Sequence, residues 1–222
     1  MAGTKLTFAI YSLFKAQLLA AALCDQLPVG DSKGVATMDG TIRLRSYLKE
    51  RTAARHDRLD AVVSHAGFAD PDAYCDFLVR QFAARSGMEQ WAAVDCPADL
   101  APPPACELLA EDIASLSCAI KHPRTRAFTL PDDADPIGFA WAIAGSHMGN
   151  LVIRKQVLRD LPGASVKFLS DERMRAFWGR LRPILEAEVP IETARRAARA
   201  ADAVFDAFLD VFANPDDGKL AA

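Results

Sequence analysis

Apolar residues recur at intervals of three and four along most of the chain, which is the spacing of one face of an α-helix. Caps, prolines and glycines limit six predicted helices, which span about residues 41–64, 70–92, 105–121, 136–161, 172–187 and 191–212. Residues 122–136 are irregular and hold the one plausible short strand. Because no segment alternates between apolar and polar positions and no repeat is present, the pattern predicts an all-α single domain.

The two ends of the chain do not follow this pattern. Residues 1–38 begin with an apolar run that Lys15 interrupts and end in a polar, glycine-containing linker, so we expect an N-terminal extension of uncertain order. Residues 214–222 are expected to form a flexible tail. The helical domain is therefore predicted to span residues 39–213.

Composition narrows the class of protein. The 222 residues are 51% hydrophobic and 25% charged, with a net charge of −3 and no basic run interleaved with aromatic residues, so nucleic acid is not an expected partner. No stretch is long and apolar enough to predict a membrane span. Five cysteines, an odd number without a CxxC pair, favour reduced thiols in a cytoplasmic protein over a disulfide framework or a zinc site.

A histidine interrupts the apolar stripe of the first predicted helix. This stripe consists of Leu44, Leu48, Thr52, His56, Leu59 and Val63. Such a histidine is either a satisfied core residue or a metal ligand that a rigid helix presents. The stripe alone leaves both interpretations open, with the core residue as the more common one.

The fourth predicted helix carries a second unusual feature. Gly145 and Gly149 are four residues apart and share nearly the same face, and each costs about 1 kcal/mol relative to alanine inside a helix. Two explanations remain open for bare backbone at this spacing: close packing against another helix, which the spacing itself favours, or a flat ligand lying against the helix.

Taken together, the two features resemble the heme oxygenase family. The segment LKERTAARHDRLD is similar to the family's proximal-histidine segment at Leu48, Lys49, Thr52, His56 and Asp60. The segment AGSHMGN resembles the glycine-bearing distal segment in the Gly-Ser-x-x-Gly form of the bacterial, bacteriophytochrome-associated enzymes. The helices from FWGRLRPILEAE onward are similar to the family's C-terminal helices, so the resemblance covers roughly residues 41–213.

This resemblance implies a helical bundle in which a proximal and a distal helix sandwich a heme. His56 would be the axial iron ligand, and Asp60, one turn on, would orient its ring. Lys49 lies on the same face about 10 Å along the axis, a position that suits a cation pairing with a heme propionate. Thr52 belongs to the same motif.

On the distal side, the resemblance implies a wall formed by Gly145, Ser146, Gly149 and Asn150. Ser146 stands where many relatives have an aspartate, which implies a different water network. His147 is about 200° around the helix from Gly145 and is expected to face away from the heme. Further partners for the propionates are expected on the fifth helix, where the possible residues are Arg175, Arg180 and Arg182.

The implied activity is oxidative cleavage of heme to biliverdin with release of CO and iron, and heme is both cofactor and substrate. The implied partners are an electron donor, either a ferredoxin or a flavoprotein reductase, and a bacteriophytochrome as a possible acceptor of biliverdin. Two alternatives remain. One is a non-catalytic heme carrier or sensor on the same fold, which the apolar FAWAIA segment and Asn150 motivate. The other is a helical interaction protein in which His56 belongs to the core and the two glycines only pack.

Overall fold

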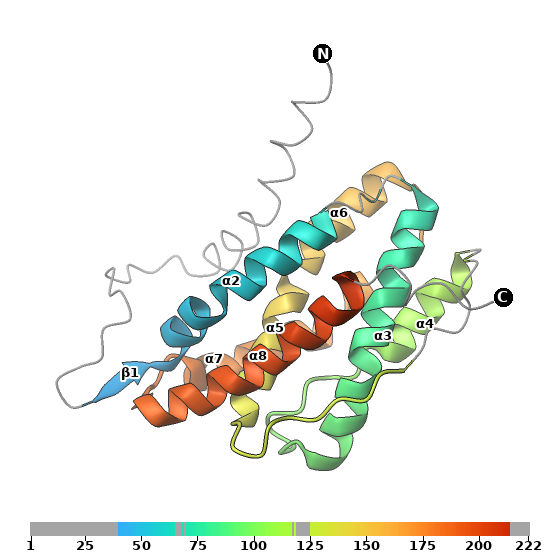
Figure 1. Cartoon of the computed structure of the whole chain (residues 1–222). Helices are drawn as coiled ribbons and strands as arrows, with labels where there is room; N and C mark the ends of the chain where they lie inside the picture. Colours follow the sequence, from blue (N-terminus) through green and yellow to red (C-terminus); the bar gives the residue numbers. More distant parts are fainter. Residues whose placement is uncertain (1–39, 65–67, 69, 117, 119–124, 214–222) are drawn as a thin grey trace.

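Two long helices that are distant in sequence, one near the start of the described residues and one at their end, run side by side along the molecule (Figure 1). The computed structural model describes residues 40–64, 68, 70–116, 118 and 125–213. The predicted extension at residues 1–38 and the predicted tail at 214–222 lie outside this part. The α-helices are α2 (Leu44–Ser64), α3 (Pro71–Asp95), α4 (Cys106–Ser115), α5 (Pro136–Met148), α6 (Asn150–Asp160), α7 (Glu172–Leu185) and α8 (Ile191–Ala213).

Aspartate caps fix the start of three helices. The side chains of Asp70, Asp135 and Asp171 each accept a hydrogen bond from the backbone N–H two residues on. Pro71 and Pro136 occupy the first helical positions, where a missing N–H costs nothing. These starts, and the mostly helical single domain, confirm the prediction from the sequence.

The sheet content differs from the prediction. The strands are β1 (Thr41–Arg43) and β2 (Glu188–Pro190), which pair antiparallel with Ile42 opposite Val189. They lie beside the starts of α2 and α8, so the first helix begins at Leu44 rather than at Thr41. The strand expected within residues 122–136 is wrong for the described part, because residues 125–135 form no strand. A sequence pattern cannot reveal a pair of three-residue strands whose partners are almost 150 residues apart.

Two helix ends were also predicted wrongly. Helix α4 ends at Ser115, well before the predicted Lys121. The predicted continuous helix 136–161 is interrupted at Gly149, although this residue keeps helical dihedral angles (φ −69°, ψ −22°). Helices α5 and α6 are therefore two halves of one interrupted rod.

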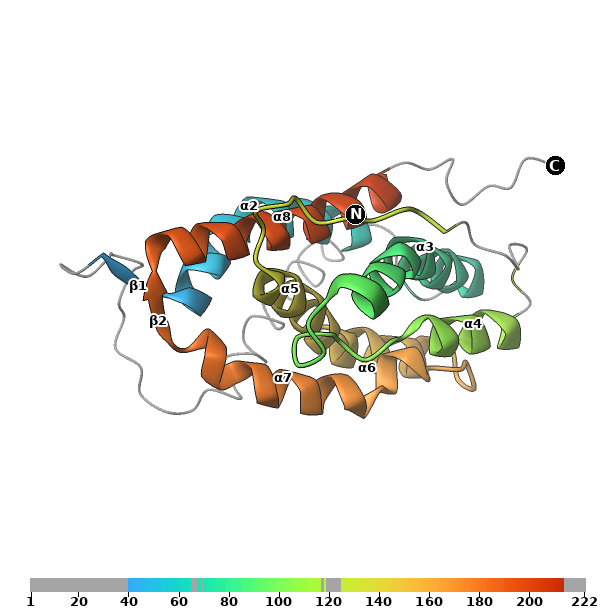
Figure 2. The same ribbon diagram turned by 90° about the horizontal axis from the view of Figure 1, so that it is seen from below.

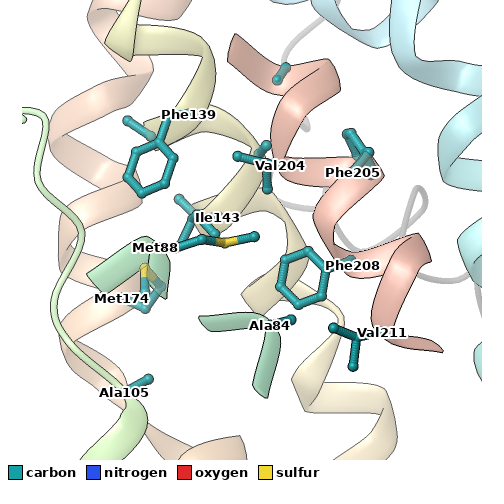
Figure 3. Packing of buried hydrophobic residues seen from close by; sticks show 14 of the residues in the cluster. Ala84, Met88, Ala105, Phe139, Ile143, Met174, Val204, Phe205, Phe208 and Val211 are labelled. Atoms are coloured by element: carbon teal, nitrogen blue, oxygen red, sulfur yellow. The ribbon is translucent and has the colours of Figure 1, made fainter. Parts of the chain in front are cut away.

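The layers meet in a core that α3, α5, α7 and α8 share. Helices α2 and α8 lie side by side in one layer, α5 lies below them, and α7 lies on the far side of α5 (Figure 2). Met88, Phe139, Ile143, Met174 and Val204 meet in this core, and each is at most 4% exposed (Figure 3). Burial of this apolar surface supplies the main stabilisation of the fold.

Two glycines permit close backbone contacts. A Cβ atom on Gly138 would lie 1.8 Å from the carbonyl oxygen of Ala197, so this glycine lets α5 approach α8. A Cβ atom on Gly87 would lie 1.8 Å from the carbonyl oxygen of Arg126, which brings α3 against the segment before α5. Both positions require the absence of a side chain.

The cysteines correct a further expectation. Cys75 of α3 and Cys118, which follows α4, form a disulfide. The expectation of five reduced thiols is therefore wrong for this pair, while Cys96 and Cys106 are free. Spacing did not reveal the pair, because 43 residues separate the two cysteines. Among the described helices, none combines the length and apolar character that a membrane crossing needs.

Candidate functional site

His56 lies in the middle of α2 with its ring partly open to solvent. The side chain is 32% exposed, and its Nδ1 lies 3.4 Å from Oδ2 of Asp60, one turn further along the helix. The edge of the His56 ring meets Phe205 of α8, with the ring centroids 5.9 Å apart. The ring is therefore only partly buried, in contrast to a histidine enclosed in a hydrophobic core.

Asp60 has an unusual environment for a carboxylate. Burial raises its pKa, and the hydrogen bond and charge of His56 partly oppose that rise. Its Oδ1 atom is buried and has no hydrogen-bond partner among the described residues. The carboxylate is therefore held against His56 and keeps one oxygen available.

The same turn of α2 could also hold a bare metal ion. Donor atoms of His56, Asp57 and Asp60 all lie within 4.8 Å of one another. Asp57 is exposed, and exposed carboxylates often lie close together without a metal. Of these three residues, His56 and Asp60 form an ion pair, with Nδ1 and Oδ2 3.4 Å apart.

The other two residues of the α2 motif have distinct surroundings. Thr52 is 1% exposed, and its hydroxyl donates to the carbonyl oxygen of Leu48 at 2.9 Å, so it is a packing residue within the helix. Lys49 is exposed and makes no hydrogen bond or ion pair with the described residues. Its ammonium group is therefore available at the surface.

Gly145 does not pack against any other helix in the described part of the chain. A Cβ atom built there would meet none of the described residues within 4 Å, in contrast to Gly138 on the same helix. This finding removes close packing as the explanation for Gly145, although spacing favoured it. Trp141, one turn before Gly145 on the same side of α5, contacts Phe205 with ring centroids 6.4 Å apart. Phe205 therefore contacts both the His56 ring of α2 and Trp141, which lies on the same face of α5 as Gly145.

Ser146 makes contact with a buried arginine. Arg85 of α3 is 3% exposed, and its guanidinium donates to the Ser146 hydroxyl oxygen at 3.1 Å. The hydroxyl itself donates to the carbonyl oxygen of Ile143 at 2.8 Å. Arg85 also stacks over the rings of Phe168 and Phe208, at 5.2 and 5.6 Å, and burial lowers its pKa. A fixed cation thus orients the side chain that follows Gly145.

His147 and Asn150 form a separate buried pair. The Nε2 atom of His147 lies 3.0 Å from the carbonyl oxygen of Asp171, and its Nδ1 lies 3.0 Å from the Asn150 amide nitrogen. Both residues are at most 6% exposed. These contacts fit a neutral ring that donates through Nε2 and accepts at Nδ1. They place the Asn150 amide against His147 and the turn before α7.

This pair predicts a dependence of stability on pH. Burial, followed by the charge of Arg85, lowers the pKa of His147 to about 4, whereas an unfolded histidine titrates near 6.5. The unfolded chain therefore binds more protons between these values, and stability falls as pH decreases from about 6.5 to about 4. We expect a loss of about 3 kcal/mol over this range, and His147→Gln should flatten the slope in urea titrations at several pH values. An unchanged slope in that variant would contradict the assignment.

The three arginines of α7 differ in position. Arg180 lies over the ring of Phe177, 5.5 Å from its centroid. Arg175 and Arg182 are three and four residues from Trp178 and share its face of the helix. Arg45 of α2 stacks over Trp178 at 5.9 Å and pairs with Glu186 at 2.8 Å. The face of α7 with Arg175 and Arg182 is thus the one next to α2.

Sequence reasoning missed Arg85 and Phe205. Arg85 lies seven residues after Leu78 and three after Phe82, so a charge in an apolar stripe was the available signal. Phe205 is one of the buried apolar residues of α8, and its contacts with α2 and α5 depend on the tertiary fold. Comparisons of the chain with protein-family models, with curated proteins and with solved structures find no match.

Proposed function

We propose that the protein binds heme between α2 and α5, with His56 as the axial ligand, and cleaves it oxidatively to biliverdin, CO and iron. The observation that carries this proposal is the convergence of His56 and the Gly145 face of α5 on Phe205. Two walls of different helices, one with an accessible imidazole and one with bare backbone, are what a flat ligand with a central metal requires.

The residues of α2 fit an axial ligand. A histidine that ligates a metal through one nitrogen needs an acceptor for the other nitrogen, which fixes its tautomer and its orientation. The Asp60 carboxylate, whose Oδ2 lies 3.4 Å from Nδ1 of His56, would supply this acceptor, and Nε2 would then be the nitrogen that binds iron. The raised pKa of Asp60 reflects a buried carboxylate that pairing with the imidazole helps to keep charged.

The residues of α5 fit the distal wall. Gly145 leaves open space where a side chain would stand, and the interruption at Gly149 changes the course of the rod one turn later. The heme, when bound, supplies an iron that binds O2 and the porphyrin carbon that is oxidised. Ser146, whose hydroxyl accepts from Arg85 and donates to Ile143, keeps one acceptor position with which it would order distal water. Asn150 is engaged with His147 and has no part in this wall.

The surface around the proposed site offers cations for the two propionates. Lys49 is exposed on the His56 side of α2 and has no ion-pair partner among the described residues, and α7 turns the face with Arg175 and Arg182 toward α2. Arg180, which stacks on Phe177, has the least favourable position of the three arginines. A propionate bound by both helices would link α2 and α7 at the rim.

Turnover on this scheme consumes O2 and electrons, so an external donor is part of the proposal. A ferredoxin or a flavoprotein reductase would supply the electrons, and a bacteriophytochrome could take the biliverdin. The compartment that offers these partners is the cytoplasm.

The apolar character of the helix before Gly145 supports a second possibility. Phe139, Ala140, Ala142 and Ile143 are all buried, so this stretch adds no polar group to the distal side. A protein with only Ser146 and Arg85 there could retain heme without degrading it. Such a carrier or sensor would bind heme but would form no biliverdin.

One experiment tests the proposal and separates the two possibilities. Titration of the protein with hemin is expected to give a stoichiometric Soret band and to quench the fluorescence of Trp141, with Trp141→Phe as the control for quenching at the other tryptophans. Addition of a reductant under air should then produce biliverdin. A stable ferrous or oxygenated spectrum without a green product would support the carrier, and the absence of a Soret shift would rule out both.

A further inference from the structure

A second site candidate lies in the groove between α2 and α8. The groove contains a cavity of about 370 Å³, within the range of about 300–1,000 Å³ that is typical of small-molecule sites. Its lining residues are Tyr47, Arg51, Arg195, Ala198, Arg199 and Asp202. The two helices that form it run side by side in the upper layer (Figures 1 and 2).

This cavity is separate from the proposed heme site. Tyr47 and Arg51 lie about 180° and 140° around α2 from His56, at 100° per residue. A heme ligated by His56 would therefore occupy another side of the helix. The cavity takes no part in the proposed function.

Positive charge dominates the cavity wall. Three guanidinium groups, from Arg51, Arg195 and Arg199, face one lining carboxylate, Asp202. Asp202 already pairs with Arg55, which lies outside the lining, at 3.0 Å. Because this carboxylate is shared, the lining has an excess of positive charge.

The arginines also have unused hydrogen-bonding capacity. Arg51 makes no hydrogen bond or ion pair with the described residues, and Nε of Arg199 is buried without a partner. Arg195 pairs with Glu192 at 3.3 Å. Arg199 pairs with Asp133 at 2.7 Å and with Glu192 at 3.8 Å. These two carboxylates are 63% and 64% exposed, and exposed pairs are weak enough for a bound anion to replace them.

We propose that this cavity binds a small polyanion that carries at least two oxyanion groups. Guanidinium groups present paired N–H donors that match the oxygens of phosphate and carboxylate, and arginines from two helices can bind two such groups at once. Tyr47 adds a hydroxyl to the same wall. Three guanidinium groups from two helices offer donors to more than one oxyanion group, which favours a diphosphate or a polycarboxylate over a single phosphate.

Calorimetric titration with pyrophosphate and, separately, with citrate tests the proposal. We expect saturable binding of at least one of them, and the stronger of the two identifies phosphate or carboxylate as the preferred chemistry. Arg51→Gln and Arg195→Gln should each weaken that binding at least about tenfold, since each removes a charged donor from the wall.

The matched control is Arg58→Gln, which removes the same charge from α2 about 10 Å further along the axis and outside the cavity. It should leave the affinity unchanged, and circular dichroism of all three variants should match that of the unmodified protein. Equal weakening in the control would mean that general surface charge attracts the anion. That result, or the absence of saturable binding, would overturn the proposal.

Discussion

His56→Ala is expected to abolish stable heme binding, or to leave heme bound without its native axial ligation. Replacing even a group that only orients a metal ligand costs about 10–100-fold in affinity, so loss of the ligand itself should cost about 100-fold or more. The helix should remain folded, because the His56 side chain is 32% exposed and is not part of the fully buried core. Hemin titration followed in the Soret region measures the affinity, and the ferrous-carbonyl spectrum reports the axial ligand.

Two comparisons make this result specific. Asp57→Asn removes the exposed carboxylate next to His56 and should leave the spectrum unchanged, whereas Asp60→Asn should alter the axial ligation while heme stays bound. Addition of imidazole to His56→Ala should restore a ligated spectrum if the space left by the side chain faces the iron. A His56→Ala protein with the spectrum of the unmodified protein would mean that another residue is the ligand.

Local signals in the sequence were sufficient for the helices. The three aspartate caps, the prolines at first helical positions and the apolar stripes each act within one or two turns, so they fix where a rod begins and which side is buried. The interruption at Gly149 was missed because its backbone remains helical, and the pattern of apolar residues continues across it. Strands β1 and β2 were missed because each is stabilised by a distant partner.

The candidate site likewise combines local features, which the sequence predicts, with contacts that depend on the tertiary fold. The His56–Asp60 pair could be predicted because an interval of four residues is enough to bring two side chains together. Phe205 joins this pair to α5 through contacts between three helices, and no spacing within one helix can reveal such a meeting point. For Arg85, position in the stripe indicated burial, but the bond to Ser146 depends on how α3 packs on α5.

Gly138→Ala is expected to destabilise the protein strongly, whereas Gly145→Ala, on the same helix, should stabilise it. The new methyl group at position 138 would lie 1.8 Å from the carbonyl oxygen of Ala197, and backbone on both sides cannot yield without separating α5 from α8. Overpacking of this kind costs about 1–3 kcal/mol and sometimes more, and we expect a net loss of about 3 kcal/mol. At position 145 the methyl group meets open space, so alanine gains about 1 kcal/mol of helix propensity.

Thermal unfolding measures both effects, because 1 kcal/mol shifts the midpoint of a chain of this size by about 2–4 °C. Gly138→Ala should unfold earlier and Gly145→Ala later than the unmodified protein. A stabilised Gly145→Ala protein that also degrades heme more slowly would link this glycine to function, since a residue that lowers stability without packing against anything needs another reason to be there. A destabilised Gly145→Ala protein would mean that the space beside Gly145 is not open. It would then contradict the assignment of Gly145 to the distal wall of the proposed site.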